Sequence, residues 1–302
     1  MEPKEAVLLA REKNIVIPAF NIAQIPVMEA VVKAVVDENS VAMVQVARVE
    51  WEKMSAGSIE ETAEEFRRCG NTDHTMLHLD HVPVIDEDNK EVDYKTLIKR
   101  AIDAGYQSVM IDGSRLSLED NIAATLKATQ MAHDAGIPCE AELGAVMGHE
   151  SGPMPPYEEI FKSKMGFTSV EEAKRFVAET GVDWLSVACG NIHGAVAEAT
   201  RNEKKPEARI DISHVDALYK AAGVPLVLHG GSGINIECIR DAIAVGIAKI
   251  NIGTEIRQTY EAALNESGGN VDKAQQSVYE KTREIISDSL RITDSRALLS
   301  EG

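Results

Sequence analysis

The segment 78–82, with the sequence HLDHV, places two imidazoles and a carboxylate at the end of an apolar run. Burying His78, Asp80 and His81 there is costly unless each side chain is hydrogen-bonded or binds an ion. The segment therefore predicts either the hydrogen-bonded end of a strand or one corner of a metal site. The positions of the other ionisable residues decide between the two.

Further ionisable residues interrupt or follow apolar runs later in the chain. Asp112 ends the run SVMID, and the segment EAELG carries Glu140 and Glu142. These two glutamates are two residues apart, so they face the same side of a strand. His193 lies in GNIHG and His229 lies in LHGGSG. The chain thus repeats one pattern, in which chemistry-bearing side chains stand at or just past the end of an apolar segment.

Strand-like and helix-like segments alternate along the chain. Short apolar runs without strict alternation are typical of parallel strands that are buried on both faces. The predicted strands are 15–22, 41–47, 75–81, 108–113, 138–144, 184–190, 225–230 and 248–254. A predicted helix follows each strand, and several end at a glycine; these helices are 25–39, 59–69, 93–105, 117–136, 169–181, 213–223, 236–246 and 255–267.

Eight βα units in about 250 residues predict a (β/α)8 TIM barrel. The alternative is a doubly wound open sheet, but no G-x-G-x-x-G sequence follows the first strand. The residues after 270 predict an extra C-terminal helix that packs outside the barrel or on a neighbouring subunit. Neither a linker nor a low-complexity tract is present, so we expect a single domain over residues 1–302.

The composition excludes several classes of partner. The chain has 49 acidic and 31 basic residues, for a formal net charge of −18, which disfavours nucleic acid and anionic membrane surfaces. It lacks both an apolar stretch of membrane-spanning length and the pattern of a signal peptide. The four cysteines are scattered and indicate reduced thiols. We therefore expect a cytoplasmic protein.

In a TIM barrel, functional side chains gather at the carboxyl ends of the strands. His81, His193 and His229 follow the third, sixth and seventh predicted strands, so they share one rim. Three imidazoles suit zinc and leave a coordination position open for a substrate. Any one of these histidines alone is more often simply hydrogen-bonded, but all three beside Asp80 and Glu142 predict a metal site.

Two glycine-rich segments occupy the same rim. HGGSG (229–233) precedes the seventh predicted helix, and NIGT (251–254) precedes the eighth. Backbone amides at these helix N-termini, with the hydroxyls of Ser232 and Thr254, would form an anion cradle. The loops after strands seven and eight are the usual phosphate site of TIM barrels. The alternative is that both segments are only tight βα turns.

Taken together, the segments HLDH, MIDGS, EAELG, GNIHG, LHGGSG and KINIGT resemble the class II (zinc-dependent) fructose- and tagatose-bisphosphate aldolases. The resemblance runs from about residue 15 to residue 290. It implies reversible cleavage of a ketose phosphate or bisphosphate into dihydroxyacetone phosphate and an aldehyde. It also implies one Zn²⁺ per subunit, a monovalent cation as a further option, and a homodimer or homotetramer.

The resemblance assigns a role to each matching residue. His81, His193 and His229 would bind the zinc. Glu142 would be a ligand for an alternate metal position, and Asp112 would be a further acidic residue near the metal.

Two carboxylates would move protons in this scheme. Asp80 would be the acid/base that serves the aldehyde-side oxygen. Glu150, in the loop GHESGPMPPYEE, would move the proton at the nucleophilic carbon. The residues that would hold dihydroxyacetone phosphate are Gly194, Gly230, Ser232, Asn251, Gly253 and Thr254.

One departure from the family pattern concerns the phosphate. In relatives, the metal-binding HG is followed by an aromatic–lysine pair that helps to hold the phosphate, whereas here the run is HGAVAEAT and no lysine follows until Lys204. Arg201, Lys204 and Lys205 are substitutes, although a solvated charged loop is the stronger interpretation of this segment. The alternative function is an aldolase on the same scaffold with a non-phosphorylated or carboxylated donor or acceptor.

Three other interpretations are open. Arg257, Arg291 and Arg296 are candidates for binding a second anionic group of the substrate. A zinc hydrolase of the barrel type is disfavoured because AFNI (19–22) lacks an H-x-H sequence. A non-catalytic relative of the aldolases is disfavoured because the acidic residues and histidines of the pattern are intact.

Overall fold

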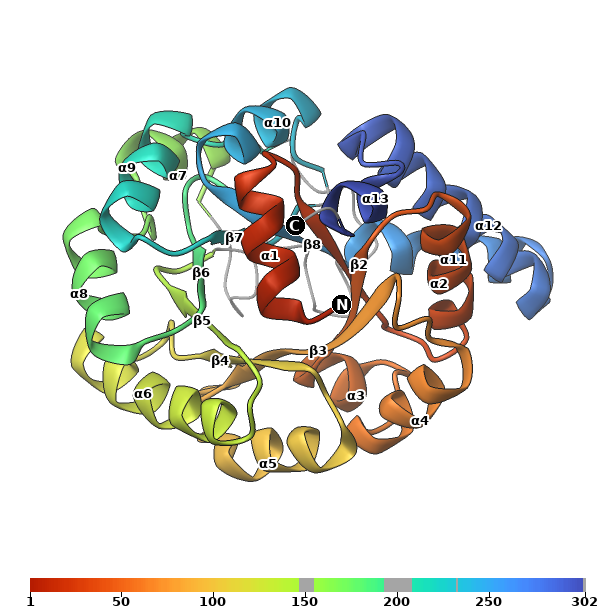
Figure 1. Cartoon of the computed structure of the whole chain (residues 1–302), viewed down its shortest axis with the longest axis horizontal. Coiled ribbons are helices and arrows are strands. Elements are labelled where there is room, and N and C mark those ends of the chain that lie inside the picture. Colours follow the sequence, from red (N-terminus) through yellow and green to blue (C-terminus); the bar gives the residue numbers. More distant parts are fainter. Residues whose placement is uncertain (147–154, 193–207, 232, 301–302) are drawn as a thin grey trace.

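The computed structural model describes residues 1–146, 155–192, 208–231 and 233–300. Within these ranges, eight parallel strands close into a barrel in sequential order, and the last strand pairs with the first. Helices surround the barrel (Figure 1), so the predicted (β/α)8 TIM barrel is confirmed. The strands are β1 (Ile17–Asn21), β2 (Ala42–Ala47), β3 (Thr75–Pro83), β4 (Ser108–Asp112), β5 (Cys139–Leu143), β6 (Trp184–Val187), β7 (Leu226–Leu228) and β8 (Ile247–Ile252).

The helices fall near the predicted positions, with short additional ones between them. The helices of the described residues are α1 (Pro3–Glu12), α2 (Val27–Asp37), α3 (Arg48–Lys53), α4 (Ile59–Cys69), α5 (Tyr94–Ala104), α6 (Leu118–Asp134), α7 (Tyr157–Ser163), α8 (Val170–Thr180), α9 (Ile212–Ala222), α10 (Ile236–Val245), α11 (Thr254–Glu266), α12 (Val271–Glu284), the π-helical η1 (Ile285–Leu290) and α13 (Ser295–Ser300).

Local sequence explains where many helices begin and end. The hydroxyl of Ser58 accepts a hydrogen bond from the Glu61 amide at the start of α4, and the Asp93 carboxylate accepts one from the Thr96 amide at the start of α5. Such side-chain caps satisfy amides that have no partner within the helix. Helix α5 then ends at Gly105 with φ of +92°, a left-handed conformation that glycine adopts without strain.

Helix α1 closes the end of the barrel at which the strands begin. It lies across the centre of the barrel in Figure 1, with α13 and the N-terminus nearby. Its Ala6, Val7 and Ala10 are buried against the lower interior of the barrel and against Leu299 of α13. This apolar plug leaves the opposite end, where the strands finish, as the mouth of the barrel.

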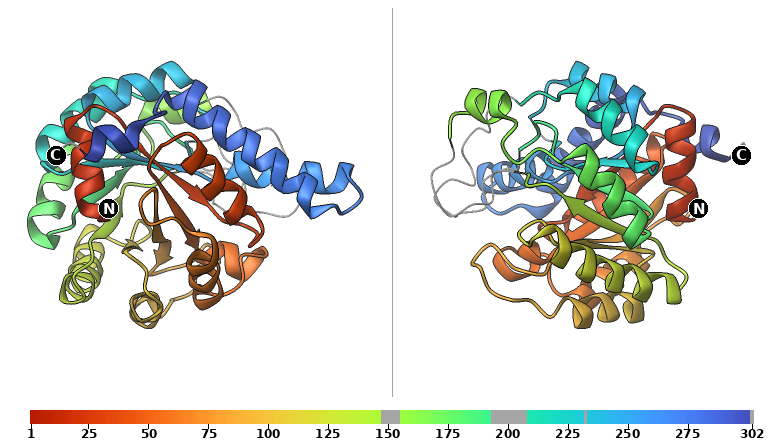
Figure 2. Two further views of the ribbon diagram at one scale, coloured as in Figure 1. Left: turned by 45° about the vertical axis from the view of Figure 1, so that its right-hand side comes forward. Right: turned by 90° about the vertical axis from the view of Figure 1, so that its left-hand side faces the viewer.

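The C-terminal segment extends the fold beyond eight βα units. Helix α12 packs on α11 and α2, and the hydroxyl of Tyr279 donates a hydrogen bond of 2.8 Å to Asp37. Figure 2 shows the α11–α12 pair projecting from one side of the barrel. The predicted extra helix is therefore confirmed, and within this chain it packs outside the barrel. Among the described residues, no helix combines the length and the apolar composition that crossing a membrane requires.

Candidate active site

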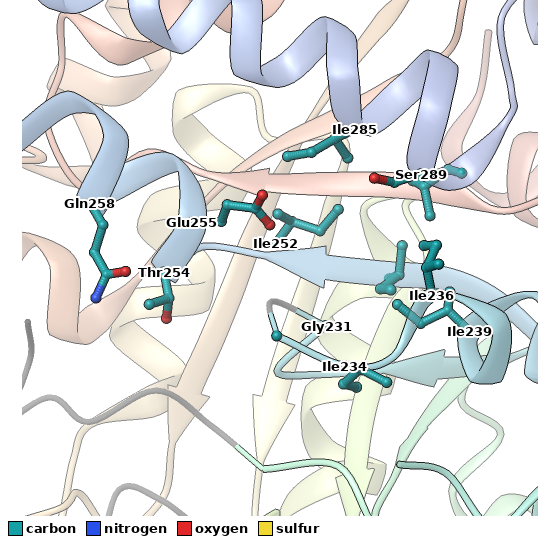
Figure 3. Close-up of a pocket in the computed structure, with 13 residues that line it drawn as sticks. Gly231, Ile234, Ile236, Ile239, Ile252, Thr254, Glu255, Gln258, Ile285 and Ser289 are labelled. Atoms are coloured by element: carbon teal, nitrogen blue, oxygen red, sulfur yellow. The ribbon is translucent and has the colours of Figure 1, made fainter. Parts of the chain in front are cut away.

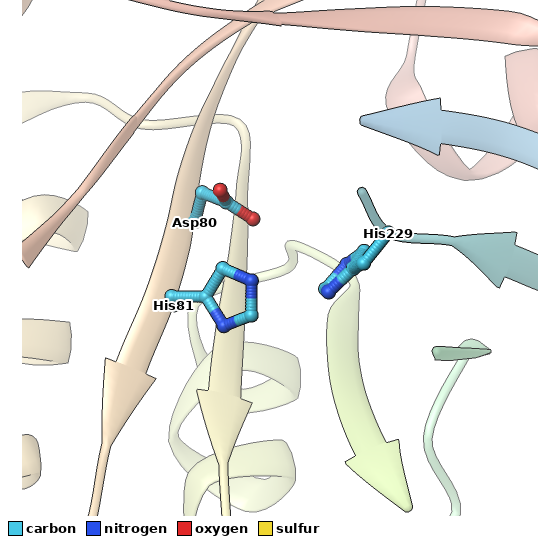
Figure 4. Close-up of side chains that lie close together, drawn as sticks. All are labelled: Asp80, His81 and His229. Atoms are coloured by element: carbon cyan, nitrogen blue, oxygen red, sulfur yellow. The ribbon is translucent and has the colours of Figure 1, made fainter. Parts of the chain in front are cut away.

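Strand β3 ends in a bulge that turns two consecutive side chains toward the mouth of the barrel. Its register against β4 shifts between Leu79 and Val82, and His81 has a φ of +32°. A regular strand would send the neighbouring side chains of Asp80 and His81 to opposite faces, whereas a bulge re-aims a side chain. In Figure 4, Asp80 and His81 both point toward His229 at the end of β7.

These three side chains form a compact cluster. Asp80, His81 and His229 each offer a ligand atom, and these atoms lie within 4.8 Å of one another. The ring centroids of the two histidines are 4.5 Å apart. Asp80 and His229 are buried, with 1% and 0% of their surfaces exposed. The structure thus brings together three of the residues that the sequence analysis placed on the rim.

Carboxylates from the neighbouring strands surround both imidazoles. On β5, Glu142 lies 3.0 Å from Nδ1 of His229, and Glu140 lies 2.8 Å from Nε2 of the same ring. On β4, Asp112 lies 3.1 Å from Nδ1 of His81. His81, Asp112 and Glu142 form a second set whose ligand atoms lie within 4.8 Å. The prediction that Glu140 and Glu142 share one face of a strand is confirmed.

The surrounding negative charge dominates the protonation of the histidines. Burial by itself would lower the pKa of His81, but the charge of Asp80 and the hydrogen bond to Asp112 raise that pKa to about 10. Burial and the charge of His81 would lower the pKa of His229, whereas its hydrogen bonds to Glu140 and Glu142 raise it. Without a bound metal ion, the neighbouring carboxylates therefore favour the protonated form of both rings.

This set of donors fits a divalent metal ion. Imidazole nitrogens and carboxylate oxygens are ligands that zinc accepts, and the described residues supply both kinds within a few ångströms. A bound divalent ion would replace the protons on the imidazoles, because metal ligation requires the neutral ring. His193, the third histidine of the predicted site, and the loop residue Glu150 lie outside the described residues.

A network of side-chain amides holds Asp80. Asn21 and Asn251 donate hydrogen bonds of 2.8 and 2.9 Å, one to each carboxylate oxygen of Asp80. Gln45 donates a 2.9 Å bond to Asn21, and Lys249 donates a 2.7 Å bond to Asn251. Both carboxylate oxygens therefore act as acceptors. Sequence reasoning missed Asn21, Gln45 and Lys249; the available signal was polar residues within otherwise apolar strands.

The charges nearby keep Asp80 ionised. Burial would raise its pKa, but the charges of His81, His229 and Lys249 lower it. Glu50, at the start of α3, behaves in the opposite way, because its burial raises its pKa to about 8. Its carboxyl accepts a 2.7 Å hydrogen bond from the Ala47 amide. Sequence reasoning did not single out Glu50.

His78 lies deeper in the barrel than Asp80. It is completely buried, its Nδ1 lies 2.8 Å from the Ser108 hydroxyl, and its Nε2 lies 3.6 Å from Glu140. Burial and the neighbouring charge of Lys249 lower the pKa of His78 to about 3. His78 is thus a neutral ring beneath the cluster, next to one of its carboxylates.

The glycine-rich segments line a cavity of about 400 Å³ beside β7 and β8 (Figure 3). Gly230 has a φ of +63°, and a Cβ on Gly231 would lie only 2.6 Å from the Ile250 side chain. Thr254 is the first residue of α11, and Gly253 caps it. The lining residues are Gly231, Gly233, Ile234, Ile236, Ile239, Ile250, Ile252, Thr254, Glu255, Gln258, Ile285, Ser289 and Leu290.

The described residues include only part of the predicted anion cradle. The described lining of this cavity includes no lysine or arginine. Asn251 turns its amide toward Asp80 inside the barrel, whereas Gly231 and Thr254 face the cavity. Ser232 and Gly194 lie outside the described residues, as do the basic residues of the segment 201–205.

The arginines considered for a second anionic group lie elsewhere. Arg296 donates to the backbone oxygen of Asp73, just before β3 begins, so it lies at the plugged end of the barrel. Arg291 follows η1, and the backbone oxygen of the next residue, Ile292, accepts a hydrogen bond from Ser40, just before β2. Arg257 is buried and pairs with Glu261 on its own helix at 2.8 Å. The prediction was wrong for Arg291 and Arg296, because the C-terminal segment runs back to the plugged end.

Comparison with known proteins finds relatives that match most of this chain. The family model described as "Fructose-bisphosphate aldolase class-II" matches residues 1–297. A fructose-bisphosphate aldolase of Staphylococcus aureus (strain Mu50) is 32% identical over 254 residues, which are 83% of this chain and 80% of that protein. A fructose-bisphosphate aldolase of Streptococcus pyogenes serotype M1 is 30% identical over 296 residues, covering 97% of this chain and 89% of that protein.

A solved structure is similar over nearly the same length. The crystal structure of the YdjI aldolase from Escherichia coli K12 aligns with a TM-score of 0.75 and 27% sequence identity, covering 97% of this chain and 98% of that one. The family model matches almost the entire sequence. The chain therefore belongs to the class II fructose-bisphosphate aldolase family and is an aldolase, a carbon–carbon lyase.

Proposed function

We propose that this protein is a zinc-dependent aldolase that reversibly cleaves a ketose phosphate or bisphosphate, of the fructose or tagatose type, into dihydroxyacetone phosphate and an aldehyde. The observation that carries the proposal is the cluster of Asp80, His81 and His229, whose ligand atoms lie within 4.8 Å at the mouth of the barrel. Membership of a family that is generally metal-dependent supports it.

Three histidines hold the zinc in this proposal. His81 and His229 are two of them, and His193 is the third. Glu142, 3.0 Å from His229 and 3.9 Å from His81, would bind the metal in an alternate position, with Asp112 beside it. When bound, the ion would stabilise the negative charge that develops on the donor's oxygens.

Two carboxylates transfer the protons. During cleavage, Asp80 takes the hydroxyl proton on the aldehyde side, the carbon–carbon bond breaks, and its electron pair stays on the donor carbon. Glu150 then supplies a proton to that carbon, so that dihydroxyacetone phosphate leaves. The reverse steps form the ketose. Asp80 suits this role because it is ionised and both its oxygens are held in place by asparagine amides.

The donor phosphate would lie at the glycine-rich segments. Gly230, Gly253 and Thr254 flank or line the cavity beside β7 and β8, with Ser232 and Gly194 completing the phosphate set. Asn251, whose amide lies on Asp80, would contact another part of dihydroxyacetone phosphate. Backbone amides at the N-terminus of α11 favour an anion.

The second candidate is an aldolase with a non-phosphorylated or carboxylated donor or acceptor. The absence of lysine and arginine from the described lining of the cavity favours it, together with the missing lysine after the HG pair.

The whole chain would act as one domain in a cytoplasmic homodimer or homotetramer. The strongly acidic charge of −18 fits a protein whose partners are small substrates instead of nucleic acid or membranes.

Product analysis tests the proposal. The zinc-loaded protein is incubated with fructose 1,6-bisphosphate and with tagatose 1,6-bisphosphate, and the products are identified by NMR. We expect dihydroxyacetone phosphate from at least one ketose phosphate. Cleavage only of ketoses without a phosphate on the donor half would favour the second candidate, and no cleavage of any ketose would reject both.

A further inference from the structure

A second, smaller pocket opens on the other side of the metal cluster. It has a volume of about 60 Å³ and lies at the ends of β3 and β4. His81 and Asp112 line it, so it shares two residues with the candidate metal site. The glycine-lined cavity, by contrast, adjoins β7 and β8. A substrate that bridges the metal cluster would therefore have one end near each pocket.

Two arginines line this smaller pocket. Arg48 is the first residue of α3, and its side chain is 21% exposed. One of its nitrogens lies 3.3 Å from Asp86, which anchors the guanidinium and leaves other N–H groups for a ligand. Arg115 lies in the turn after β4, is exposed, and makes no ion pair with any residue in the described part of the chain.

The acidic residues of the pocket already have partners of opposite charge. Glu87 lies 2.5 Å from Lys53, and Asp112 is hydrogen-bonded to His81. Arg115 therefore supplies positive charge that no ion pair in the described part of the chain balances, and Arg48, although paired with Asp86, has further N–H groups for a ligand. On a chain with a net charge of −18, such a local site is what an anionic substrate needs in order to bind.

We infer that Arg48 and Arg115 recognise an anionic group on the acceptor aldehyde, at the end away from its carbonyl. This inference rests on the proposed aldolase function and adds the class of the second substrate. Guanidinium groups bind carboxylates and phosphates through paired N–H donors. The recognised group is thus a carboxylate or a phosphate, which the experiment distinguishes.

The test compares three aldehydes that differ only at the far end. Glyceraldehyde has a neutral hydroxymethyl group, tartronate semialdehyde has a carboxylate, and glyceraldehyde 3-phosphate has a phosphate. Each is condensed with dihydroxyacetone phosphate by the zinc-loaded protein, and kcat and KM are measured. We expect at least one anionic aldehyde to have a kcat/KM about ten times or more that of glyceraldehyde, and the better of the two identifies the group.

Variants connect this preference to the two arginines. Arg115→Gln and Arg48→Gln should each raise the KM for the preferred anionic aldehyde by about tenfold to a hundredfold, as expected when a charged hydrogen bond is lost. They should change kcat/KM for glyceraldehyde less than about threefold. Arg48→Lys keeps a charge beside Asp86, which guards against local unfolding, and should still raise the KM because it loses the planar fork.

The control is Arg67→Gln, which removes an exposed arginine from the last turn of α4 at the plugged end; it should leave all three aldehydes unaffected. Deuterium uptake at C3 of dihydroxyacetone phosphate, without any aldehyde, reports the proposed function independently. Normal uptake combined with no preference for either anionic aldehyde, or with an equal loss for all three in Arg115→Gln, would overturn the inference. Absent uptake in the wild type would instead reject the proposed function.

Discussion

At the scale of single residues, the site depends on His81 adopting a backbone conformation that is rare outside glycine. Its φ of +32° and the β3 bulge let Asp80 and His81 face the same cluster. Such strain costs on the order of 1–3 kcal/mol and persists where the surroundings enforce it. The side chains of Asp112, Glu142 and His229 surround His81 here, which is consistent with a functional reason for the strain.

Replacing either described histidine should remove the metal. We expect His81→Ala and His229→Ala to lose bound zinc, measured as metal per chain after dialysis, and to lose aldol cleavage with it. His133→Gln is the matched control, because His133 lies on α6 and contacts Asp183 instead of the cluster. Full turnover without bound metal in either cluster variant would contradict the assignment.

Substitutions of Asp80 and Glu150 should affect cleavage and deuterium exchange differently. Asp80→Asn should lower cleavage by about 10²- to 10⁴-fold while sparing most of the deuterium exchange into dihydroxyacetone phosphate. Glu150→Gln should abolish both reactions. NMR exchange and a cleavage assay on the same preparations check this. The assignment fails if Asp80→Asn loses exchange as completely as cleavage, with its zinc content unchanged.

The sequence located most of the chemistry at this scale but not its supporting residues. The HLDH, EAELG and LHGGSG motifs identified Asp80, Glu142 and His229. Nothing in the local pattern showed that Asn21 and Asn251 would meet on Asp80, because those contacts join β1, β3 and β8 across the barrel. The bulge was also hidden, since it depends on the pairing of β3 with β4.

At the scale of elements, the start of α3 carries a stability effect that depends on pH. Glu50 has a pKa of about 8 in the folded protein, against an ordinary value of 4.5, so folding favours its protonated form. The contribution of protonated Glu50 to the free energy of unfolding is therefore fully present below about pH 4.5 and is lost as the pH rises through 8. We expect the unfolding free energy of the metal-free wild type to fall over this range relative to Glu50→Gln.

Urea denaturation of both proteins at pH 5, 6.5 and 8 measures this difference, because the other titrating groups are common to the two. From pH 5 to pH 8, the unfolding free energy of the wild type should fall relative to that of Glu50→Gln by an amount on the order of a few kcal/mol. If the unfolding free energy of the wild type relative to Glu50→Gln stays constant across the three pH values, or rises with pH, Glu50 is ionised in the folded protein.

A fully buried ion pair links β5 and β8, which are not neighbours in the sheet, across the interior of the barrel. Lys249 lies 2.9 Å from Glu140, and both side chains have no exposed surface. Lys249→Met should lower the unfolding free energy by about 3–5 kcal/mol, because it leaves a buried charge without its partner. Adding Glu140→Gln should recover part of the loss. Lys99→Met, which breaks the exposed pair with Asp103, is the control and should cost less than about 1 kcal/mol.

The order and type of the elements could be predicted because each strand is a short apolar run followed by an amphipathic helix. All eight predicted strands overlap the observed ones. The short helices α3 and α7 were missed, since they lie in segments that looked like loops. Helix α13 was missed because its position depends on packing against α1 at the plugged end.

At the scale of the whole molecule, the barrel separates stability from chemistry. Helix α1 and Leu299 fill one end with apolar side chains, while the buried ionisable residues of β3, β5 and β7 occupy the other. Interior contacts between strands far apart in sequence therefore decide the protonation of the site. This explains why the sequence predicted the residues of the rim but neither their protonation nor the arginine-lined pocket beside them.

Hydrogen exchange at C3 of dihydroxyacetone phosphate, followed by NMR in deuterated water, is the most direct test of zinc-dependent aldol chemistry in this protein. It compares zinc-loaded, metal-stripped and zinc-restored protein, with His229→Ala as a further control, and it requires no knowledge of the aldehyde. Zinc-dependent aldol chemistry predicts exchange of one of the two C3 protons by the zinc-loaded and restored protein only. Equal exchange by the stripped protein, or no exchange by the zinc-loaded protein, would contradict it.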